Sequence, residues 1–341
     1  MKKVLFVLVT VVLLGGFLFT GCSKKEKSSA GSDKITIGVL FDFLSVESRV
    51  KQRDSLIEFA KQYDVNLIFQ SANGDERLQL QQAENLITQG VDVMVILAQN
   101  PEACLPIVLG CKEAGIPLLV TDRPLENMDV GFFVGINMDD IGYMQVDYAL
   151  ARKPEGKWVM LAGAPTDPLA RIWRDSWVDR LQPYIARNAL QIVADERCDN
   201  WDPNVALKHM ENILTANRDD IDVVLVMNDG LATGVIQALE ARGLAGKVLM
   251  TGLDGEIVAY QRIVEGKQAM TVAFDDVAIA DAIVKSAISA AKKEQLATNG
   301  TIDNGDKRIP AFLIDPFVVD INNLEQVVIK GGLATREEIY Q

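Results

Sequence analysis

The sequence has very little histidine, and this scarcity removes several classes of protein at once. His209 is the only histidine, so a zinc site or a catalytic centre of the Ser-His or Cys-His kind has almost no imidazole to draw on. We expect His209 to lie on a helix surface. No G-x-G-x-x-G motif follows any predicted strand, which leaves a dinucleotide site unsupported. The sequence therefore predicts neither a metal nor a cofactor.

Positive charge and cysteine are also in short supply. The chain has 34 Lys and Arg against 47 Asp and Glu, a net charge of -13, and such an acidic chain repels phosphate backbones. Nucleic acid is therefore excluded as a partner. Cys104 and Cys111 would lie roughly 10 Å apart on a helix, too far for a disulfide. We expect them and Cys198 to be free, buried thiols.

The first residues have the pattern of a secretory signal. Two lysines precede the apolar run 4–19, and small residues lead to Cys22. The run is shorter than the roughly 20 residues of a spanning helix, which disfavours the alternative of a permanent transmembrane anchor. Residues 1–22 resemble a bacterial lipoprotein signal, and this implies lipidation of Cys22, although Phe19 stands where such signals usually have Leu. The polar residues 23–33 predict a flexible tether.

The rest of the chain, residues 34–341, alternates between predicted strands and helices. Short runs rich in β-branched residues predict strands at 35–41, 66–69, 92–97, 117–121, 131–135, 157–161, 190–195, 222–227, 247–252 and 269–274. Amphipathic stretches between them predict helices near 47–62, 76–89, 101–114, 139–150, 168–186, 203–216, 230–242 and 256–264. A ninth helix, 277–293, precedes the polar stretch 294–308 and the apolar run 309–319. This alternation is typical of parallel βαβ units.

The order of the elements predicts an α/β fold of two doubly wound parallel-sheet lobes joined by a multi-strand hinge. The N-terminal lobe would comprise residues 34–136 and 275–308, because the ninth helix has no partner left in the second series. The C-terminal lobe would comprise residues 137–274 and 309–341. Lobes joined by several crossings are expected to close around a ligand like a hinge.

Polar side chains follow most of the predicted strands, at the sheet edge where ligands bind in open parallel sheets. They are Asp42 with Phe43, Gln99-Asn100, Asp122-Arg123, Asp167, Asp199-Asn200-Trp201, Asn228-Asp229 and Asp254. Carboxylates, amides, an arginine and an indole suit a neutral polyol, because hydroxyls need donors and acceptors together and sugar C–H faces pack on aromatic rings.

At these residues the chain resembles the periplasmic sugar-binding proteins of the type I, ribose-like family, and most closely the D-xylose-binding ABC transporter solute receptors. The matching phrases include QSANGDERLQLQQAENLITQGVDVMVI, TDRP, HMENILTANRDDIDVV and GLDG, and the resemblance covers about residues 34–335. It implies a type I periplasmic binding protein fold and a receptor that feeds an ABC importer.

Carried over position by position, the resemblance implies a set of sugar contacts: Asp122, Arg123, Asp167, Arg174, Trp201, Asn228 and Asp254, with Trp173 in place of a family Phe. Several positions depart from the family pattern. Ser48, next to Arg49, replaces an Arg, while Leu169, Phe274 and Phe43 replace an Asn, a Lys and an Asp. Because polar contacts are lost and an aromatic wall of Phe43 and Phe274 is gained, we expect a hexose to bind better than xylose.

Together these features predict a monomeric, lipid-anchored extracytoplasmic receptor that is not an enzyme. Its expected partners are a monosaccharide, an ABC permease and, through the lipid, the membrane. Two alternatives stay open: a signalling receptor that docks on a sensor kinase or chemoreceptor, and a glycosidase that uses Asp122 and Asp254 as paired carboxylates. A plainer interpretation also remains for Asp122, Asn228 and Asp254, which could merely cap the helices that follow them.

Overall fold

The computed structural model describes residues 34–44 and 47–340. The predicted lipidation site Cys22, the signal of residues 1–22 and the tether of residues 23–33 lie outside the described residues. Within the described part of the chain, no helix is both long and apolar enough to cross a bilayer.

A seven-stranded sheet forms the centre of the first lobe. Its strand order is β11-β12-β5-β4-β3-β1-β2, and every pairing is parallel except that of β11 with β12. The strands are β1 (Thr36–Phe41), β2 (Asn66–Ser71), β3 (Val93–Leu97), β4 (Leu118–Thr121), β5 (Phe132–Ile136), β11 (Gly300–Asp303) and β12 (Arg308–Ile314). β3 and β5 are buried along their whole length, as expected for strands covered on both faces.

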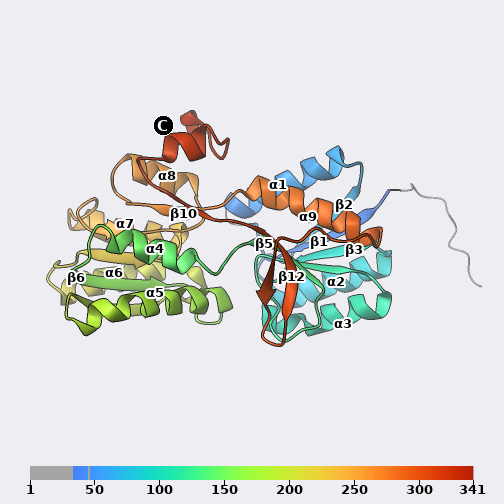
Figure 1. The fold of residues 1–341 in the computed structure, drawn as a ribbon, viewed down its shortest axis with the longest axis horizontal. Helices are drawn as coiled ribbons and strands as arrows, with labels where there is room; N and C mark the ends of the chain where they lie inside the picture. Colours follow the sequence, from blue (N-terminus) through green and yellow to red (C-terminus); the bar gives the residue numbers. More distant parts are fainter. Residues whose placement is uncertain (1–33, 45–46, 341) are drawn as a thin grey trace, which may run out of the picture. The chain divides into compact units, whose positions relative to one another are not determined.

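Helices cover both faces of this sheet. They are α1 (Glu47–Gln62), α2 (Glu76–Gln89), α3 (Leu105–Ala114), which follows the 3-10 turn η1 (Pro101–Cys104), and α9 (Asp276–Ala291). Figure 1 shows α1 and α9 on one side of the sheet and α2 and α3 on the other. Asp75 begins α2 by accepting two backbone N–H groups, and Gly90 ends it in the left-handed conformation.

A second, four-stranded parallel sheet has the order β7-β6-β8-β9. Its strands are β6 (Gly156–Ala162), β7 (Leu190–Arg197), β8 (Val223–Val226) and β9 (Leu249–Met250). The helices around it are α4 (Ile141–Leu150), α5 (Pro168–Ala186), α6 (Pro203–Ala216), α7 (Asp229–Ala241) and α8 (Ile257–Val264), with the 3-10 turn η2 (Asp199–Trp201) before α6. α4 and α5 pack against each other, and the Trp177 indole N–H of α5 donates to Gln145 Oε1 of α4 at 3.1 Å.

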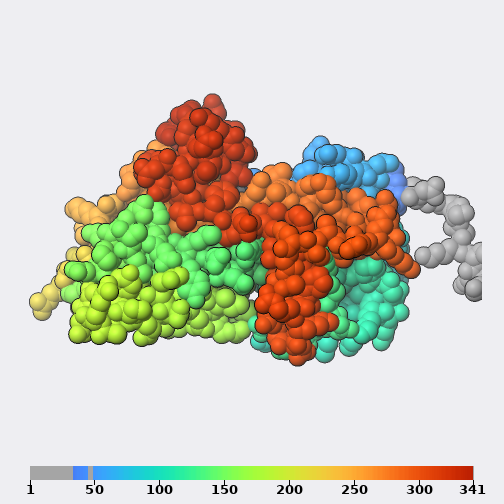
Figure 2. All heavy atoms as spheres, viewed as in Figure 1, coloured from blue at the N-terminus to red at the C-terminus, as the bar shows by residue number. Residues whose placement is uncertain are grey.

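The remaining strands, β10 (Thr271–Ala273) and β13 (Phe317–Val319), pair antiparallel with each other. The chain then forms the π-helical turn η3 (Glu325–Ile329) and the short helix α10 (Arg336–Ile339). These C-terminal residues gather beside α8, as Figure 2 shows in dark red and orange, and they share an apolar cluster with it that includes Tyr260, Ile263, Leu324 and Val328. Lys51 Nζ of α1 also donates to the Leu333 carbonyl at 2.6 Å.

The two sheets agree with the predicted doubly wound α/β class, and the chain after α9 differs from the prediction in two details. β12 pairs in parallel with β5, so the first sheet extends through Ile314, whereas we expected residues from 309 onward to join the second lobe. β11 lies within the stretch 294–308 that we predicted to be polar and without a strand; it is an exposed edge strand that gains its order by pairing with β12. The three described cysteines are free and buried, as predicted.

Candidate ligand-binding site

Arg123 is the centre of a network of ion pairs at the carboxyl ends of the strands. Its Nη1 lies 2.8 Å from Asp42 Oδ2 and 3.1 Å from the Ala98 carbonyl oxygen, while its Nε lies 3.3 Å from Asp167 Oδ2. Asp42 follows β1 in the first sheet, and Asp167 begins α5 beside the second sheet. A single guanidinium therefore joins carboxylates from both lobes, because arginine presents several N–H donors in a fixed geometry.

Arg49 of α1 is a second cation in this network. Its Nη2 lies 2.8 Å from Asp122 Oδ2, and its Nε lies 3.5 Å from Asp42 Oδ1. Burial by itself would raise the pKa of Asp122, but the positive charges of Arg49 and then Arg123 outweigh it, so that pKa lies below its ordinary value. Sequence reasoning did not include Arg49 in the site; the only signal was its position next to Ser48, where the resembling proteins carry an Arg.

Asn228 and Asp254 form a second cluster beside the second sheet. Asn228 Nδ2 donates to Asp254 Oδ2 at 3.2 Å, and its Oδ1 accepts the Leu231 N–H at 2.9 Å. Burial raises the pKa of Asp254 well above its ordinary value, and the nearby negative charge of Glu256 raises it further. Arg49 acts in the opposite direction on the same carboxyl, which shows that the two clusters lie within electrostatic reach of each other.

The aromatic residues of the predicted site have different surroundings. The ring of Trp201 lies against Gly163, where a Cβ would overlap the indole, so this position requires glycine. Phe43 and Phe274 are half-buried. Trp173 is 5% exposed and its indole N–H donates to the Met138 carbonyl at 3.1 Å, so it offers little ring face to a ligand.

Arg174 is not joined to the Arg123 network by any contact among the described residues. Its Nε donates to Asp195 Oδ1 at 3.0 Å and its Nη2 also pairs with the same carboxylate, which comes from β7. The structure thus places Asp122, Arg123 and Asp167 in one network with Arg49 and Asp42. Asn228 and Asp254 form a second group. Arg174 pairs separately with Asp195.

The capping interpretation holds for only part of the set. Asn228 caps α7, and Asp167 caps α5 by accepting the Leu169 N–H at 2.9 Å, so each has a structural role in addition to its place in the site. Asp122 and Asp254 cap no helix: Asp122 precedes a turn, and the residue at the start of α8 is Glu256. Capping therefore does not account for Asp122 or Asp254.

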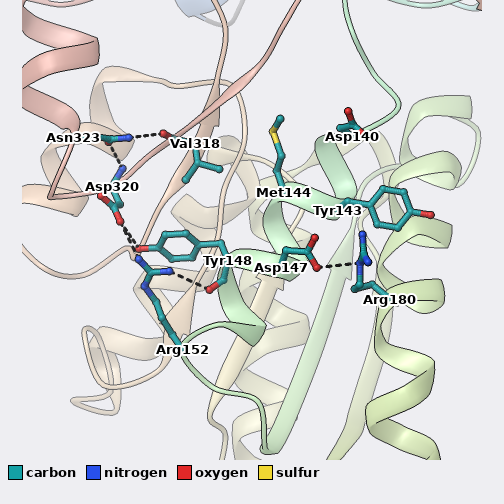
Figure 3. A pocket seen from close by; sticks show the side chains of 10 residues that line it. All are labelled: Asp140, Tyr143, Met144, Asp147, Tyr148, Arg152, Arg180, Val318, Asp320 and Asn323. Carbon is teal, nitrogen blue, oxygen red and sulfur yellow. Dashed lines mark hydrogen bonds and ion pairs between the residues drawn. The ribbon is translucent and has the colours of Figure 1, made fainter.

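A separate hollow lies between α4 and the residues that follow β13 (Figure 3). It has a cavity volume of about 570 Å³, and Tyr143, Tyr148, Arg152, Arg180 and Asp320 are among its walls. Four of its charged groups already pair with one another: Arg152 pairs with Asp320 at 3.1 Å and covers the ring of Tyr148, and Arg180 pairs with Asp147. This arrangement ties α4 to the C-terminal segment and does not resemble a prepared ligand site.

His209 has the surface position that we predicted. Its Nε2 lies 3.2 Å from the Arg197 carbonyl, and its ring is partly exposed on α6. Among the described residues, no group of His, Cys, Asp and Glu side chains could hold a metal ion.

Comparison with known proteins decides the family. Residues 37–295 match the model of the periplasmic binding protein domain. The chain belongs to the periplasmic binding protein family. It is 39% identical to the D-xylose-binding periplasmic protein of Haemophilus influenzae, with 92% of this chain and 94% of that protein covered. It is 33% identical to the D-xylose-binding periplasmic protein of Escherichia coli, with 99% of each covered.

A solved structure gives the same result for the fold. An ABC transporter solute-binding protein from Clostridium phytofermentans with bound β-D-glucose superimposes with a TM-score of 0.81 at 25% identity, over 89% of this chain and 99% of that one. The fold is therefore that of a type I periplasmic binding protein. Members of this family are substrate receptors, and the chain is accordingly a binding protein and not an enzyme.

One more carboxyl of this binding protein lies close to the site. Asp276, at the start of α9, is half-buried, and burial raises its pKa to about 7 against the opposing charges of Lys51 and Arg49. An unfolded aspartate has a pKa of about 3.9, so between about pH 4 and pH 7 the folded chain keeps a proton that the unfolded chain releases. The contribution of Asp276 to stability is therefore largest at low pH and is lost as the pH rises through this window.

We expect Asp276→Asn to reduce the dependence of stability on pH. Urea unfolding of the wild type and the variant at pH 5 and pH 8 measures the difference, and the variant should gain relative stability at pH 8. Asp306→Asn, at an exposed position, is the matched control and should leave the pH dependence unchanged. Equal pH dependence in the wild type and Asp276→Asn would show that Asp276 titrates normally.

Proposed function

We propose that this protein is an extracytoplasmic receptor that captures a monosaccharide between its two sheets and delivers it to an ABC importer. The observation that carries the proposal is the set of contacts made by Arg123, which joins carboxylates of both lobes at the carboxyl ends of the strands. A ligand held there would touch both lobes, so binding would favour the closed form, in which the lobes approach each other.

Each polar side chain of the site would help to hold a sugar. Asp122, Asp167, Asn228 and Asp254 would accept hydrogen bonds from hydroxyls, and Arg123 would donate to hydroxyl or ring oxygens. Arg49 joins the proposed set, because it contacts Asp122. Arg174 would donate from an orientation fixed by Asp195. Trp201 would stack on the ring of the sugar, while the buried Trp173 would support the wall from behind.

For the identity of the sugar, we propose a hexose in preference to xylose. The two curated relatives are named for D-xylose, whereas the Clostridium phytofermentans structure holds β-D-glucose. In this chain a hydroxyl that faces Leu169 or Phe274 would lose a hydrogen bond, at a cost of roughly 0.5–1.5 kcal/mol each. The hydroxymethyl group of a hexose can lay its methylene on Phe274, and xylose would leave that surface unfilled.

The relatives and the signal-like first residues support a place of action outside the cytoplasm. The relatives are periplasmic proteins by name, and the segment that ends at Cys22 supports export with a lipid anchor. We propose that the protein works as a monomer held at the membrane by this lipid, and that the ligand-bound form is what the permease of the importer recognises.

A thermal-shift screen of monosaccharides tests the proposal. We expect D-glucose or D-galactose to raise the melting temperature of residues 34–341 more than D-xylose does. A ligand at about 100 times its dissociation constant adds roughly 2.7 kcal/mol to stability, enough for a clear shift. A large shift with xylose and none with hexoses would restore xylose as the ligand. No shift with any sugar would contradict the function itself.

A further inference from the structure

Asp229, the first residue of α7, is fully buried and its carboxylate is surrounded by hydrogen-bond donors. Its Oδ1 accepts from Gln268 Nε2 at 2.8 Å. Its Oδ2 accepts from Thr271 Oγ1 at 2.8 Å and from the backbone N–H groups of Gly255 at 3.0 Å and Glu256 at 3.2 Å. The side chain thus grips the backbone directly after Asp254.

The backbone of residues 253–256, which Asp229 contacts, has a conformation that its own residues do not favour. Asp254 has a φ of 104°, a region that a residue with a side chain rarely adopts and that persists only when neighbouring contacts impose it. The Asp229 N–H also donates to the Leu253 carbonyl at 2.8 Å, so Asp229 holds the chain on both sides of Asp254. A Cβ on Gly252 would overlap the Asp229 carboxylate, which shows how closely this backbone packs on it.

The consecutive residues Asn228 and Asp229 therefore hold Asp254 in different ways. Asn228 contacts its carboxylate, whereas Asp229 contacts only the backbone around it. Every contact of the Asp229 carboxylate comes from an N–H or a hydroxyl, an arrangement that suits the ionised form. Burial and then the charge of Glu256 raise its pKa to about 7, and the buried Arg262 donates to the Asp229 carbonyl.

We propose that Asp229 is a positioning residue for sugar binding: it fixes the turn of residues 254–256 so that Asp254 presents its carboxylate to the ligand, and it does not touch the ligand itself. This rests on the proposed function, in which Asp254 is a sugar contact. An asparagine at position 229 keeps the volume but replaces one acceptor oxygen with an NH₂ group that would face donors.

The test compares Asp229→Asn with the wild type by calorimetry, using D-glucose and D-xylose as probes. We expect affinity for whichever sugar the wild type binds to fall roughly 10- to 100-fold, the effect of leaving a buried polar group unpaired. In an Asp254→Ala background the same change should have almost no further effect, because the residue through which Asp229 acts is gone. A full additional loss in that background would overturn the positioning role.

Hydrogen exchange tests the same inference without any ligand. The amides of Gly255 and Glu256 should lose protection in Asp229→Asn, and retained protection would overturn the proposal whatever the sugar. If Asp229→Asn folds poorly, Thr271→Val replaces it in the test. This change removes one donor to Asp229 while keeping the volume, and it should reduce the protection of the same amides by a smaller amount. Lost protection together with no sugar binding by the wild type would instead contradict the proposed function, and with it the binding role of Asp229.

The matched control is Asp222→Asn, at the opposite end of β8. Asp222 Oδ2 accepts the Lys157 N–H at 2.8 Å, so this change also removes a carboxylate that supports backbone. We expect Asp222→Asn to lower the melting temperature and to leave sugar affinity and the exchange of residues 255 and 256 unchanged. An equal loss of affinity in both variants would show that Asp229 acts only through general stability.

Discussion

Replacing Arg123 with alanine is expected to weaken sugar binding by roughly 2–5 kcal/mol, the cost of removing one partner from a buried set of charges. Arg123 contacts Asp42, Asp167 and the Ala98 carbonyl, so its loss leaves carboxylates from both lobes without a shared cation. Arg123→Lys should recover little of the affinity, because a single ammonium group cannot reproduce the separate Nε and Nη1 contacts. Isothermal titration calorimetry with the sugar that the wild type binds measures the change.

Arg171→Ala is the control for Arg123→Ala. Arg171 pairs with Glu126 at 3.0 Å, but its side chain is 54% exposed, so the variant should bind sugar normally. Asp254→Ala, from the second cluster, should weaken binding as Arg123→Ala does. Unchanged affinity in both Arg123→Ala and Asp254→Ala would show that the site lies elsewhere.

Most of the fold could be predicted because hydrophobic periodicity is a local property of the chain. α1, α2, α5 and α6 begin and end where the amphipathic pattern does. β9 is the counter-example: the apolar run 247–252 predicts a longer strand, but only Leu249–Met250 pair with β8. β11 was missed for the opposite reason, since its order comes from pairing with β12 and its own residues carry little strand signal.

The candidate site could be predicted from the sequence where its residues follow strand ends, and could not where they do not. Asp122, Arg123 and Asp254 were predicted as site residues because the carboxyl ends of parallel strands meet at one sheet edge. Arg49 lies within a helix, 73 residues from the carboxylate it contacts, and no local pattern marks an arginine that folding will bring to a distant aspartate. The role of Asp229 was hidden for a similar reason, because its partners Gln268 and Thr271 lie far along the chain.

Asp42→Ala is expected to have the largest effect on stability, because Asp42 is the fully buried anion shared by two arginines. It lies 2.8 Å from Arg123 Nη1 and 3.5 Å from Arg49 Nε, and it also accepts the Phe43 N–H at 2.7 Å. Its removal leaves two guanidinium groups close together with too little negative charge. Breaking a buried ion pair in this way costs about 3–5 kcal/mol, which urea unfolding of residues 34–341 would measure.

The control for Asp42→Ala is Asp195→Ala, which also removes the carboxylate partner of an arginine. Asp195 pairs with Arg174, but the two side chains are 28% and 24% exposed, so solvent can take over and the expected loss is about 0–1 kcal/mol. A second variant isolates the cause. If the cost of Asp42→Ala comes from cations left unpaired, Asp42→Ala with Arg49→Ala should be more stable than Asp42→Ala by itself. A double variant less stable than the single one would mean that Arg49 stabilises the fold through its packing and its contact with Asp122, and that repulsion between the two arginines is not what makes Asp42 necessary.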